Sequence, residues 1–172
     1  TKGVRSQNEL AQESSEVADF WNMLQGFQTS GKCVDKAHYR IRYMKSFRPI
    51  SVKEDIEFKE ARPILYLNMA AVASLFNSRN MNATANRSNW STITSYLKSH
   101  SSFLGLKQDR FTILLPSGLP DYSIEIVNNE QVRKIKVNRP KALCFDYLQL
   151  KEAFGLELET EMVSDAQDSE GV

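Results

Sequence analysis

The chain contains 172 residues, of which 41% are hydrophobic and 10% aromatic, as in a folded globular protein with a single core. No apolar run approaches the roughly 20 residues that span a bilayer, so we expect no membrane association. The chain starts at Thr1 rather than Met, and this polar start lacks the apolar segment of a signal peptide. We therefore expect an excised part of a larger cytoplasmic protein, with a disordered edge over 1–6.

The formal net charge of +1 conceals an uneven distribution of charge along the chain. The last 21 residues, from Glu152, contain seven acidic side chains and no Lys or Arg. The rest of the chain therefore holds all 22 basic residues and 14 of the 21 acidic ones, a balance of +8. A basic body favours a surface that binds polyanions, and we expect the acidic tail over 161–172 to be disordered. The alternative is that the tail is only a solvated terminus.

Apolar periodicity predicts a long first helix followed by a strand. The helix is expected over 7–30, because apolar side chains recur there at spacings of three and four and Gly31 follows the last of them. Strict alternation then predicts a half-buried strand over 35–44. The apolar face of the helix consists of Val17, Phe20, Trp21, Leu24 and Phe27. In the strand, Tyr39, Ile41 and Tyr43 are expected in the core, and His38, Arg40 and Arg42 outward.

The segment from Arg62 to Phe111 alternates strands and helices in the order found in a winged helix. A short strand is expected around Ile56 before it begins. The second of its helices carries an apolar stripe of Trp90, Ile93 and Leu97, which we expect to lie in the core. The elements predicted within the segment are a strand over 64–67, a helix over 70–80, a helix over 88–100 and a strand starting at 110 and running to 115.

A β-hairpin with a polar tip is the next predicted feature. With it, the elements predict one α+β domain over 7–160, winged-helix-like, with the hairpin as its wing and the first helix as an N-terminal addition. The remaining elements are strands over 122–127 and 132–137 around the tip 128–130, a strand over 142–147, and a helix over 147–154 that ends at Gly155.

The residues that carry catalysis in other proteins are absent or scattered in this sequence. There is no Gly-x-Ser-x-Gly elbow, and the seven glycines form no phosphate-binding loop. The two cysteines, Cys33 and Cys144, and the two histidines, His38 and His100, lack metal-ligand spacing. We therefore expect no enzymatic activity, no metal and no cofactor, and we expect Cys144 to be a buried small hydrophobe.

Basic side chains cluster around the second helix of the 62–111 segment and on the hairpin, which favours contact with nucleic acid. Each cation can pair with a phosphate and release condensed counterions, giving affinity that does not depend on base sequence. The outer face of that helix offers small hydroxyls, so a grip on the backbone is favoured over base reading. The alternative is ordinary surface charge. The predicted DNA-binding residues are Arg87, Ser91, Lys98, Lys107, Arg133, Lys134 and Lys136.

Three segments together resemble the C-terminal winged-helix-like domain of primase/helicase-like replication proteins of bacterial mobile elements and phages. They are Val-Ala-Asp-Phe-Trp at 17–21, Trp-Ser-Thr-Ile-Thr-Ser-Tyr-Leu-Lys-Ser at 90–99 with Phe-Leu-Gly at 103–105, and Ala-Leu-Cys-Phe-Asp-Tyr at 142–147. The resemblance implies an accessory module that helps the helicase and primase domains of its parent protein to engage DNA. A second interpretation is a protein-interaction or oligomerisation module that uses the winged-helix surface and the N-terminal helix.

Overall fold

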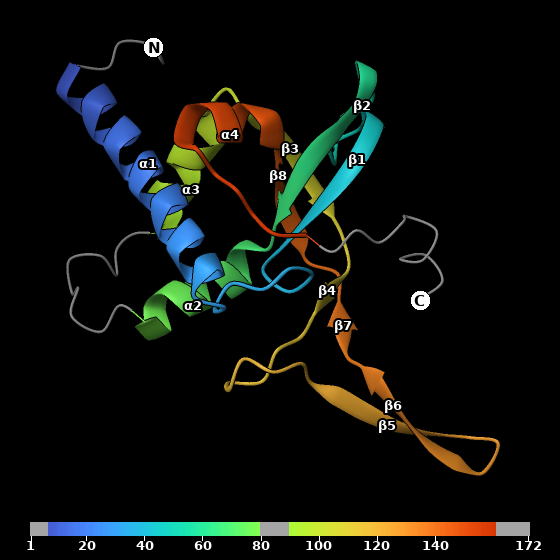
Figure 1. Ribbon diagram of the computed structural model, residues 1–172. Coiled ribbons are helices and arrows are strands. Elements are labelled where there is room, and N and C mark those ends of the chain that lie inside the picture. Colours follow the sequence, from blue (N-terminus) through green and yellow to red (C-terminus); the bar gives the residue numbers. More distant parts are fainter. Residues whose placement is uncertain (1–6, 80–89, 161–172) are drawn as a thin grey trace.

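The computed structural model describes residues 7–79 and 90–160, and Figure 1 shows their arrangement. Within these ranges the chain is a mixed α+β protein with four helices and antiparallel sheets. The helices are α1 (Gln7–Thr29), α2 (Met69–Arg79), α3 (Trp90–Ser99) and α4 (Tyr147–Phe154). The strands are β1 (Tyr39–Phe47), β2 (Ile56–Leu67), β3 (Phe103–Gln108), β4 (Phe111–Thr112), β5 (Tyr122–Val127), β6 (Glu130–Ile135), β7 (Val137–Asn138) and β8 (Lys141–Asp146).

A four-stranded antiparallel sheet in the order β1-β2-β8-β3 forms the centre of the domain. The last residues of β2 are buried, and so is β8 from Ala142 onward. These buried halves pair with each other, from Ile64 opposite Asp146 to Leu67 opposite Leu143. Because alternate side chains of a strand point to opposite faces, the two strands supply a core on each side of the sheet.

All four helices contribute to the larger core, which covers one face of the sheet. Trp21 of α1 meets Phe145 of β8 edge-on, with 5.1 Å between ring centroids. Phe20 stacks on Phe76 of α2 at 5.3 Å. The predicted apolar face of the first helix is thus confirmed, and it is used within this domain, so it does not offer a free docking surface. The buried side chains of that face are Val17, Phe20, Trp21 and Leu24.

The opposite face of the sheet is covered by a smaller core, where Phe47 and Phe111 are fully buried. The expected outward orientation of Arg40 is therefore wrong: this side chain follows the predicted alternation, but its face meets protein, and it is only 5% exposed. The same expectation is wrong for His38, which is also 5% exposed because it packs beside the start of α2. Conversely, Tyr43 was expected in the core and is exposed. The alternation in β1 correctly predicts which side chains share a face, but it does not predict which face meets water.

β2 is one strand of twelve residues where the sequence predicts two. It continues through Pro63, which lies opposite Tyr43 of β1. β8 pairs with β2 only from Ile64 onward, so at Pro63 one side of the strand is open and requires no N–H donor. The outer parts of β1 and β2 therefore extend beyond the sheet as a two-stranded ribbon (Figure 1).

The strand predicted from 110 to 115 is present only as the short β4, and the edge strand of the main sheet is β3. β3 contains a bulge, because Phe103 lies opposite Phe145 and Gly105 opposite Cys144, which leaves Leu104 as an extra residue. A bulge shifts the alternation of side chains by one position. Pattern analysis of the sequence therefore does not detect β3.

The predicted hairpin is confirmed as β5 and β6, but its second strand begins two residues earlier than expected. Asn128 and Asn129 have φ values of 52° and 65°, as in a two-residue type I′ turn. Tyr122 consequently lies opposite Ile135, and Val127 opposite Glu130. This register determines which charges face each other on the hairpin.

The last described segment returns from α4 to the first strand. α4 ends as predicted at Gly155, which has φ 66° and donates its N–H to the Lys151 carbonyl. Beyond it, Leu156 is buried in the larger core. The Tyr39 hydroxyl then donates a hydrogen bond to the Glu159 carbonyl. The expected disorder over 1–6 and 161–172 concerns residues outside the described ranges.

Candidate nucleic-acid interface

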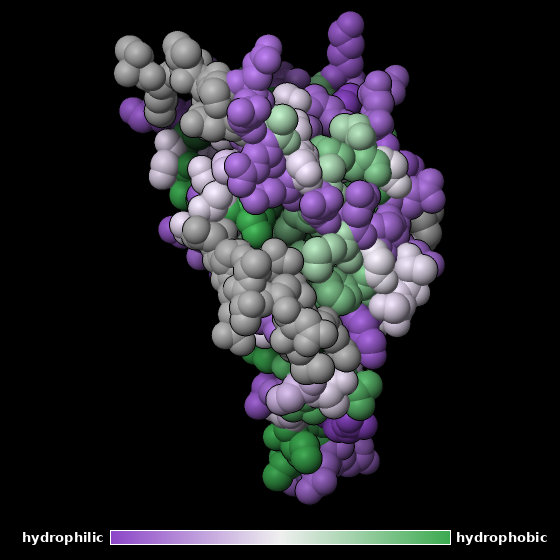
Figure 2. Space-filling view, turned by 90° about the vertical axis from the view of Figure 1, so that its left-hand side faces the viewer, coloured by the Kyte–Doolittle hydropathy of each residue, from purple (hydrophilic) through white to green (hydrophobic). Residues whose placement is uncertain are grey.

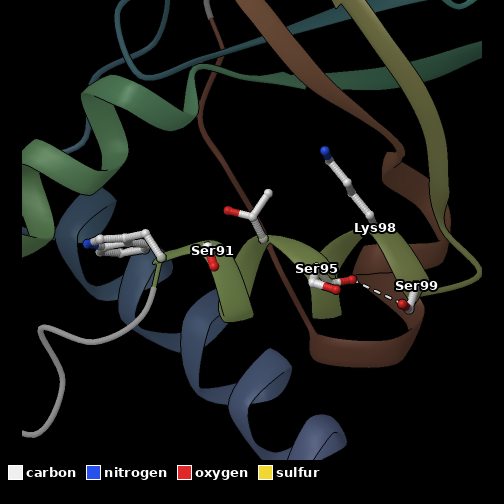
Figure 3. A pocket seen from close by; sticks show the side chains of 6 residues that line it. Ser91, Ser95, Lys98 and Ser99 are labelled. Carbon is white, nitrogen blue, oxygen red and sulfur yellow. Dashed lines mark hydrogen bonds between the residues drawn. The ribbon is translucent and has the colours of Figure 1, made fainter.

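The outer face of α3 holds two of the predicted DNA-binding residues, Ser91 and Lys98. Both line a shallow hollow whose described lining contains no carboxylate. Figure 3 shows Ser91, Ser95 and Ser99 on one side of the helix and Lys98 extending from the other. The Ser99 hydroxyl donates to the Ser95 carbonyl at 3.0 Å, so it is engaged within its own helix. One side of α3 therefore offers the exposed hydroxyls of Ser91 and Ser95 to a phosphate backbone, and the other side offers the Lys98 ammonium group.

Trp90 lines the same hollow, but its contacts belong mainly to the core. Its ring lies 5.4 Å from the ring of Phe76, in an edge-on arrangement. Its indole N–H donates to the Oδ1 atom of Asn77 at 3.2 Å. Trp90 therefore joins the start of α3 to the end of α2, which agrees with the prediction that it serves the core.

Lys107 lies on the opposite side of the sheet from α3. Its ammonium group is 5.2 Å from the centroid of the Phe47 ring, a cation–π distance. Phe47 belongs to the smaller core, whereas Leu97 of α3 belongs to the larger one. Lys107 and Lys98 are therefore not part of one surface patch.

The hairpin carries the other three predicted cations on an arm, β5–β6, that projects from the body (Figure 1). Each of these cations has a partner on the arm or at its base. One is stacked on an aromatic ring, and the other two form ion pairs. The contacts are Arg133 with the Tyr122 ring centroid at 4.0 Å, Lys134 with Glu125 at 3.8 Å and Lys136 with Asp121 at 3.4 Å.

These contacts leave the cations of the arm accessible to a phosphate. All residues of β6 are exposed, and exposed ion pairs contribute only about 0–1 kcal/mol. A phosphate can therefore replace the carboxylate partner at little loss. Two more exposed cations, Arg139 and Lys141, follow β6, so that five basic residues lie along 133–141.

One face of the arm carries exposed isoleucines. The register places Ile124 and Ile126 on the same face as Tyr122 and Arg133, and places Lys134 and Glu125 on the opposite face. Ile124 is 66% exposed and Ile126 is 75% exposed. Figure 2 shows hydrophobic side chains gathered on the narrow projection at the lower end of the molecule. An exposed apolar surface of this kind is typical of a contact site.

The structure does not gather the predicted DNA-binding residues into one surface. Ser91 and Lys98 lie on α3, Lys107 lies on the other face of the sheet, and three cations lie on the arm. Figure 1 shows the arm at the end of the molecule away from α3. Arg87 is outside the described residues. The arm is therefore the part of the predicted site with the highest local concentration of cations.

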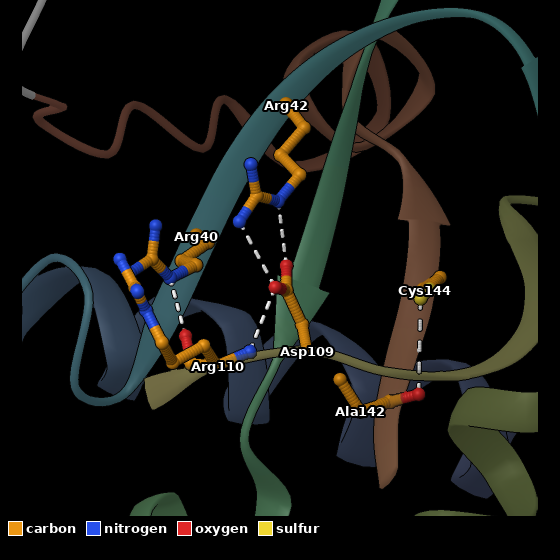
Figure 4. Close-up of polar contacts among 6 residues, drawn as sticks. All are labelled: Arg40, Arg42, Asp109, Arg110, Ala142 and Cys144. Carbon is orange, nitrogen blue, oxygen red and sulfur yellow. Dashed lines mark hydrogen bonds and ion pairs between the residues drawn. The ribbon is translucent and has the colours of Figure 1, made fainter. Parts of the chain in front are cut away.

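A polar cluster that the sequence analysis did not predict joins β1 to the segment before β4 (Figure 4). The Asp109 carboxylate accepts hydrogen bonds from Arg42 at 2.6 and 2.9 Å and from the Arg110 N–H at 2.7 Å. Arg40 donates from Nε to the Arg110 carbonyl at 2.5 Å. These two arginines of β1 therefore fix the chain that covers the smaller core. The only signal in the sequence is the pair of alternating arginines in β1. Asp109 lies 67 residues after Arg42, so no local pattern connects the two.

Both cysteines are free and buried. Burial raises the pKa of Cys33 to about 12, and burial also raises the pKa of Cys144. At neutral pH both side chains therefore remain thiols, which are poor nucleophiles. The prediction that Cys144 is a buried small hydrophobe is confirmed.

Comparison with known proteins adds no relative: no family model, no curated protein and no solved structure matches the chain. Within 7–79 and 90–160, no three His, Cys, Asp or Glu residues are grouped so that they could hold a metal ion. None of the helices in these ranges is long and apolar enough to cross a membrane. The surfaces described above are therefore the basis for a functional proposal.

Proposed function

We propose that the chain is a non-catalytic module that grips DNA by its phosphate backbone, mainly with the projecting β5–β6 arm. The observation that carries this proposal is the exposed run of five cations along 133–141: Arg133, Lys134 and Lys136 lie on the projecting arm and at its base, and Arg139 and Lys141 follow where the chain returns to β8. Against them the arm and its base carry three carboxylates, so a positive excess remains. Regularly spaced phosphates can compete for these cations, because the cations themselves are exposed and their partners are at least partly exposed.

On this proposal the arm is the wing of a winged-helix-like module, and DNA is held with little base specificity. The order of α2, α3 and the hairpin supports that assignment, as does the resemblance to replication proteins of mobile elements and phages. The helicase and primase domains of a parent protein would then act on DNA that this accessory module holds. The hydroxyls and lysine of α3 could contact a second stretch of the same backbone.

Reversing two charges on the arm should remove most of the affinity for DNA. We expect Lys134→Glu/Lys136→Glu to bind a labelled duplex at least about tenfold more weakly than the wild type at low salt, because two attractions become repulsions. The logarithm of the wild-type affinity should fall linearly with the logarithm of the salt concentration. For the variant, the slope of this line should be smaller in magnitude by about two. Fluorescence anisotropy at several salt concentrations measures both quantities.

The control variant changes the same total charge at a distance from the arm. Lys53→Glu/Lys59→Glu alters exposed positions in the β1–β2 loop and the β2 ribbon, and should bind DNA like the wild type. Lys98→Glu tests whether α3 also contacts DNA. The loss of DNA affinity in this variant should be smaller than the loss in the arm variant. The proposal fails if the wild type binds no DNA at low salt. It also fails if the arm variant binds as tightly as the control.

A second candidate function, protein docking, is favoured by the exposed isoleucines on the face of the arm opposite Lys134, a face that also carries Arg133. The apolar face can pair with its own copy about a two-fold axis, as closed dimers require, so the candidate partner is a second copy of this chain. Ile126→Lys should then abolish concentration-dependent self-association without weakening DNA binding, because the added charge is positive. Light scattering across a concentration series measures the association. A wild type that stays monomeric throughout would exclude this partner.

A further inference from the structure

A groove of about 780 Å³ lies between the start of α2 and the segment 112–119, and its lining contains none of the predicted DNA-binding residues that the structure describes. Its volume is within the range of about 300–1,000 Å³ that small-molecule sites occupy. The segment just after α1, the turn before β1 and the start of α2 form one part of its wall. The segment after β4 and residues 138 and 140 form the other part.

The lining of this groove is rich in hydrogen-bond donors and lacks negative charge. It contains Lys32, His38 and the hydroxyls of Ser74 and Thr112, but no Asp or Glu among the described residues. Apolar side chains lie beside them, including Leu75. A site with cationic and donor groups and no carboxylate favours an anionic ligand.

His38 presents a hydrogen-bond donor to the groove although it is only 5% exposed. Its Nδ1 atom accepts the Val34 N–H at 2.9 Å, so the neutral ring carries its proton on Nε2. Burial lowers the pKa of His38, which favours this neutral form. His38 lines the groove, and with Nδ1 engaged by the Val34 N–H, the Nε2–H is the donor that its side chain can offer to a ligand there.

The first turn of α2 lies in the same wall. Ala70 and Ala71 line the groove, and Asn68 precedes them as the N-cap. The Asn68 amide is already engaged, since it donates to the Ala37 carbonyl at 3.1 Å. The start of a helix carries partial positive charge from its backbone N–H groups. This helix start and the His38 Nε2–H are independent features, and both favour a negative group at one place.

We propose that this groove binds a small organic anion with an apolar body. Its charged group would lie at the first turn of α2, within reach of His38 Nε2 and the rim residue Lys32. Its apolar part would lie against Leu75 and the segment 113–119, where Leu115 and Leu119 are exposed. The groove adjoins the base of the arm, where the Ile113 N–H donates to the Lys136 carbonyl, but its lining contains none of the predicted DNA-binding residues that the structure describes. Octanoate binding can therefore be tested independently of DNA binding.

Three probes test the two parts of the ligand: octanoate has the charge and the apolar body, octanamide lacks the charge, and inorganic phosphate lacks the apolar body. NMR of the His38 imidazole reports binding directly. The chain has two histidines, so His100→Gln leaves His38 as the only imidazole signal. We expect a saturable shift with octanoate and weaker binding of the other two probes. The proposal is overturned if octanamide or phosphate binds as tightly as octanoate, or if octanoate produces no saturable shift.

Two variants locate the charged group, with backbone amide NMR as the readout. His38→Asn keeps an acceptor for the Val34 N–H but removes the Nε2 donor, and should weaken octanoate binding about tenfold or more. Lys32→Glu changes an exposed residue at the rim of the groove, so it provides the test if His38→Asn does not fold. We expect a similar loss of octanoate affinity in this variant. Lys98→Glu is the charge-matched control and should bind octanoate normally. Octanoate affinity equal to the wild type in both groove variants would refute the site.

Discussion

Gly105→Ala is expected to destabilise the domain by roughly 3 kcal/mol or more, through backbone strain and overpacking together. Gly105 has φ 139°, a value that residues with a Cβ atom rarely adopt. A Cβ here would lie 2.5 Å from Cβ and 2.7 Å from Cγ of Pro49. The proline ring cannot rotate away, so its loop must move. That movement would disturb the hydrogen bond from the Ile50 N–H to the Leu106 carbonyl, now 2.8 Å.

Gly118→Ala is the matched control, because Gly118 also has a positive φ, 91°, but no atom lies within 4 Å of a Cβ built there. Gly118→Ala is expected to lower the free energy of unfolding by about 1 kcal/mol, from conformational strain alone. Urea denaturation of both variants and the wild type measures the free energies of unfolding. Equal losses at the two positions would mean that the Pro49 loop accommodates the added Cβ atom without cost, and would contradict the overpacking argument.

Local signals in the sequence predicted the helices and the hairpin because these features depend on neighbouring residues. The apolar spacing over 7–30 predicts both α1 and its buried side, since a helix buries one stripe whatever it packs against. Gly155 predicts the end of α4 through its left-handed conformation. At the hairpin tip, the turn was expected to contain three residues. The positive φ angles of Asn128 and Asn129 instead make it a two-residue turn, which moves the second strand by two positions.

Pairing between distant segments was not visible in the sequence. Arg40 is buried because the carbonyl that it contacts belongs to Arg110, 70 residues further along the chain. β3 was missed because Leu104 interrupts its alternation, and the bulge is stabilised by pairing with β8. Whether a strand face meets water, and whether a bulge is tolerated, depends on partners that no local pattern contains.

The predicted DNA-binding residues lie apart for the same reason: their positions depend on contacts between distant segments. The order of elements over 62–111 predicts two helices before a hairpin, but not where the hairpin lies relative to the second helix. In the structure α3 packs in the larger core with α1, whereas the arm continues from β4 and β7 at the other end (Figure 1). Charges that belong to one predicted motif therefore lie on separate surfaces.

Asp109→Ala is expected to destabilise the domain by about 3 kcal/mol, the lower end of the range for breaking a buried ion pair. Asp109 is 7% exposed, and its carboxylate holds Arg42 in a two-point contact. The Arg42 side chain is 22% exposed, so water can hydrate part of its guanidinium once the carboxylate is gone. The expected loss of stability is therefore at the lower end of that range. The Arg110 N–H also loses its contact with the carboxylate. Urea denaturation at neutral pH measures the free energy of unfolding.

Asp55→Ala separates the effect of burial from that of geometry. Arg48 and Asp55 pair at 2.6 Å, the same distance as the Nε contact between Arg42 and Asp109, but their side chains are 57% and 37% exposed. The loss for Asp55→Ala should therefore be below about 1 kcal/mol. Arg42→Met/Asp109→Leu removes both charges of the buried pair. It should recover more than half of the stability lost in Asp109→Ala, because no partly buried arginine is then left without a carboxylate partner. A double variant as unstable as Asp109→Ala would show that the hydrogen bond to Arg110 accounts for the stabilisation, rather than the ion pair.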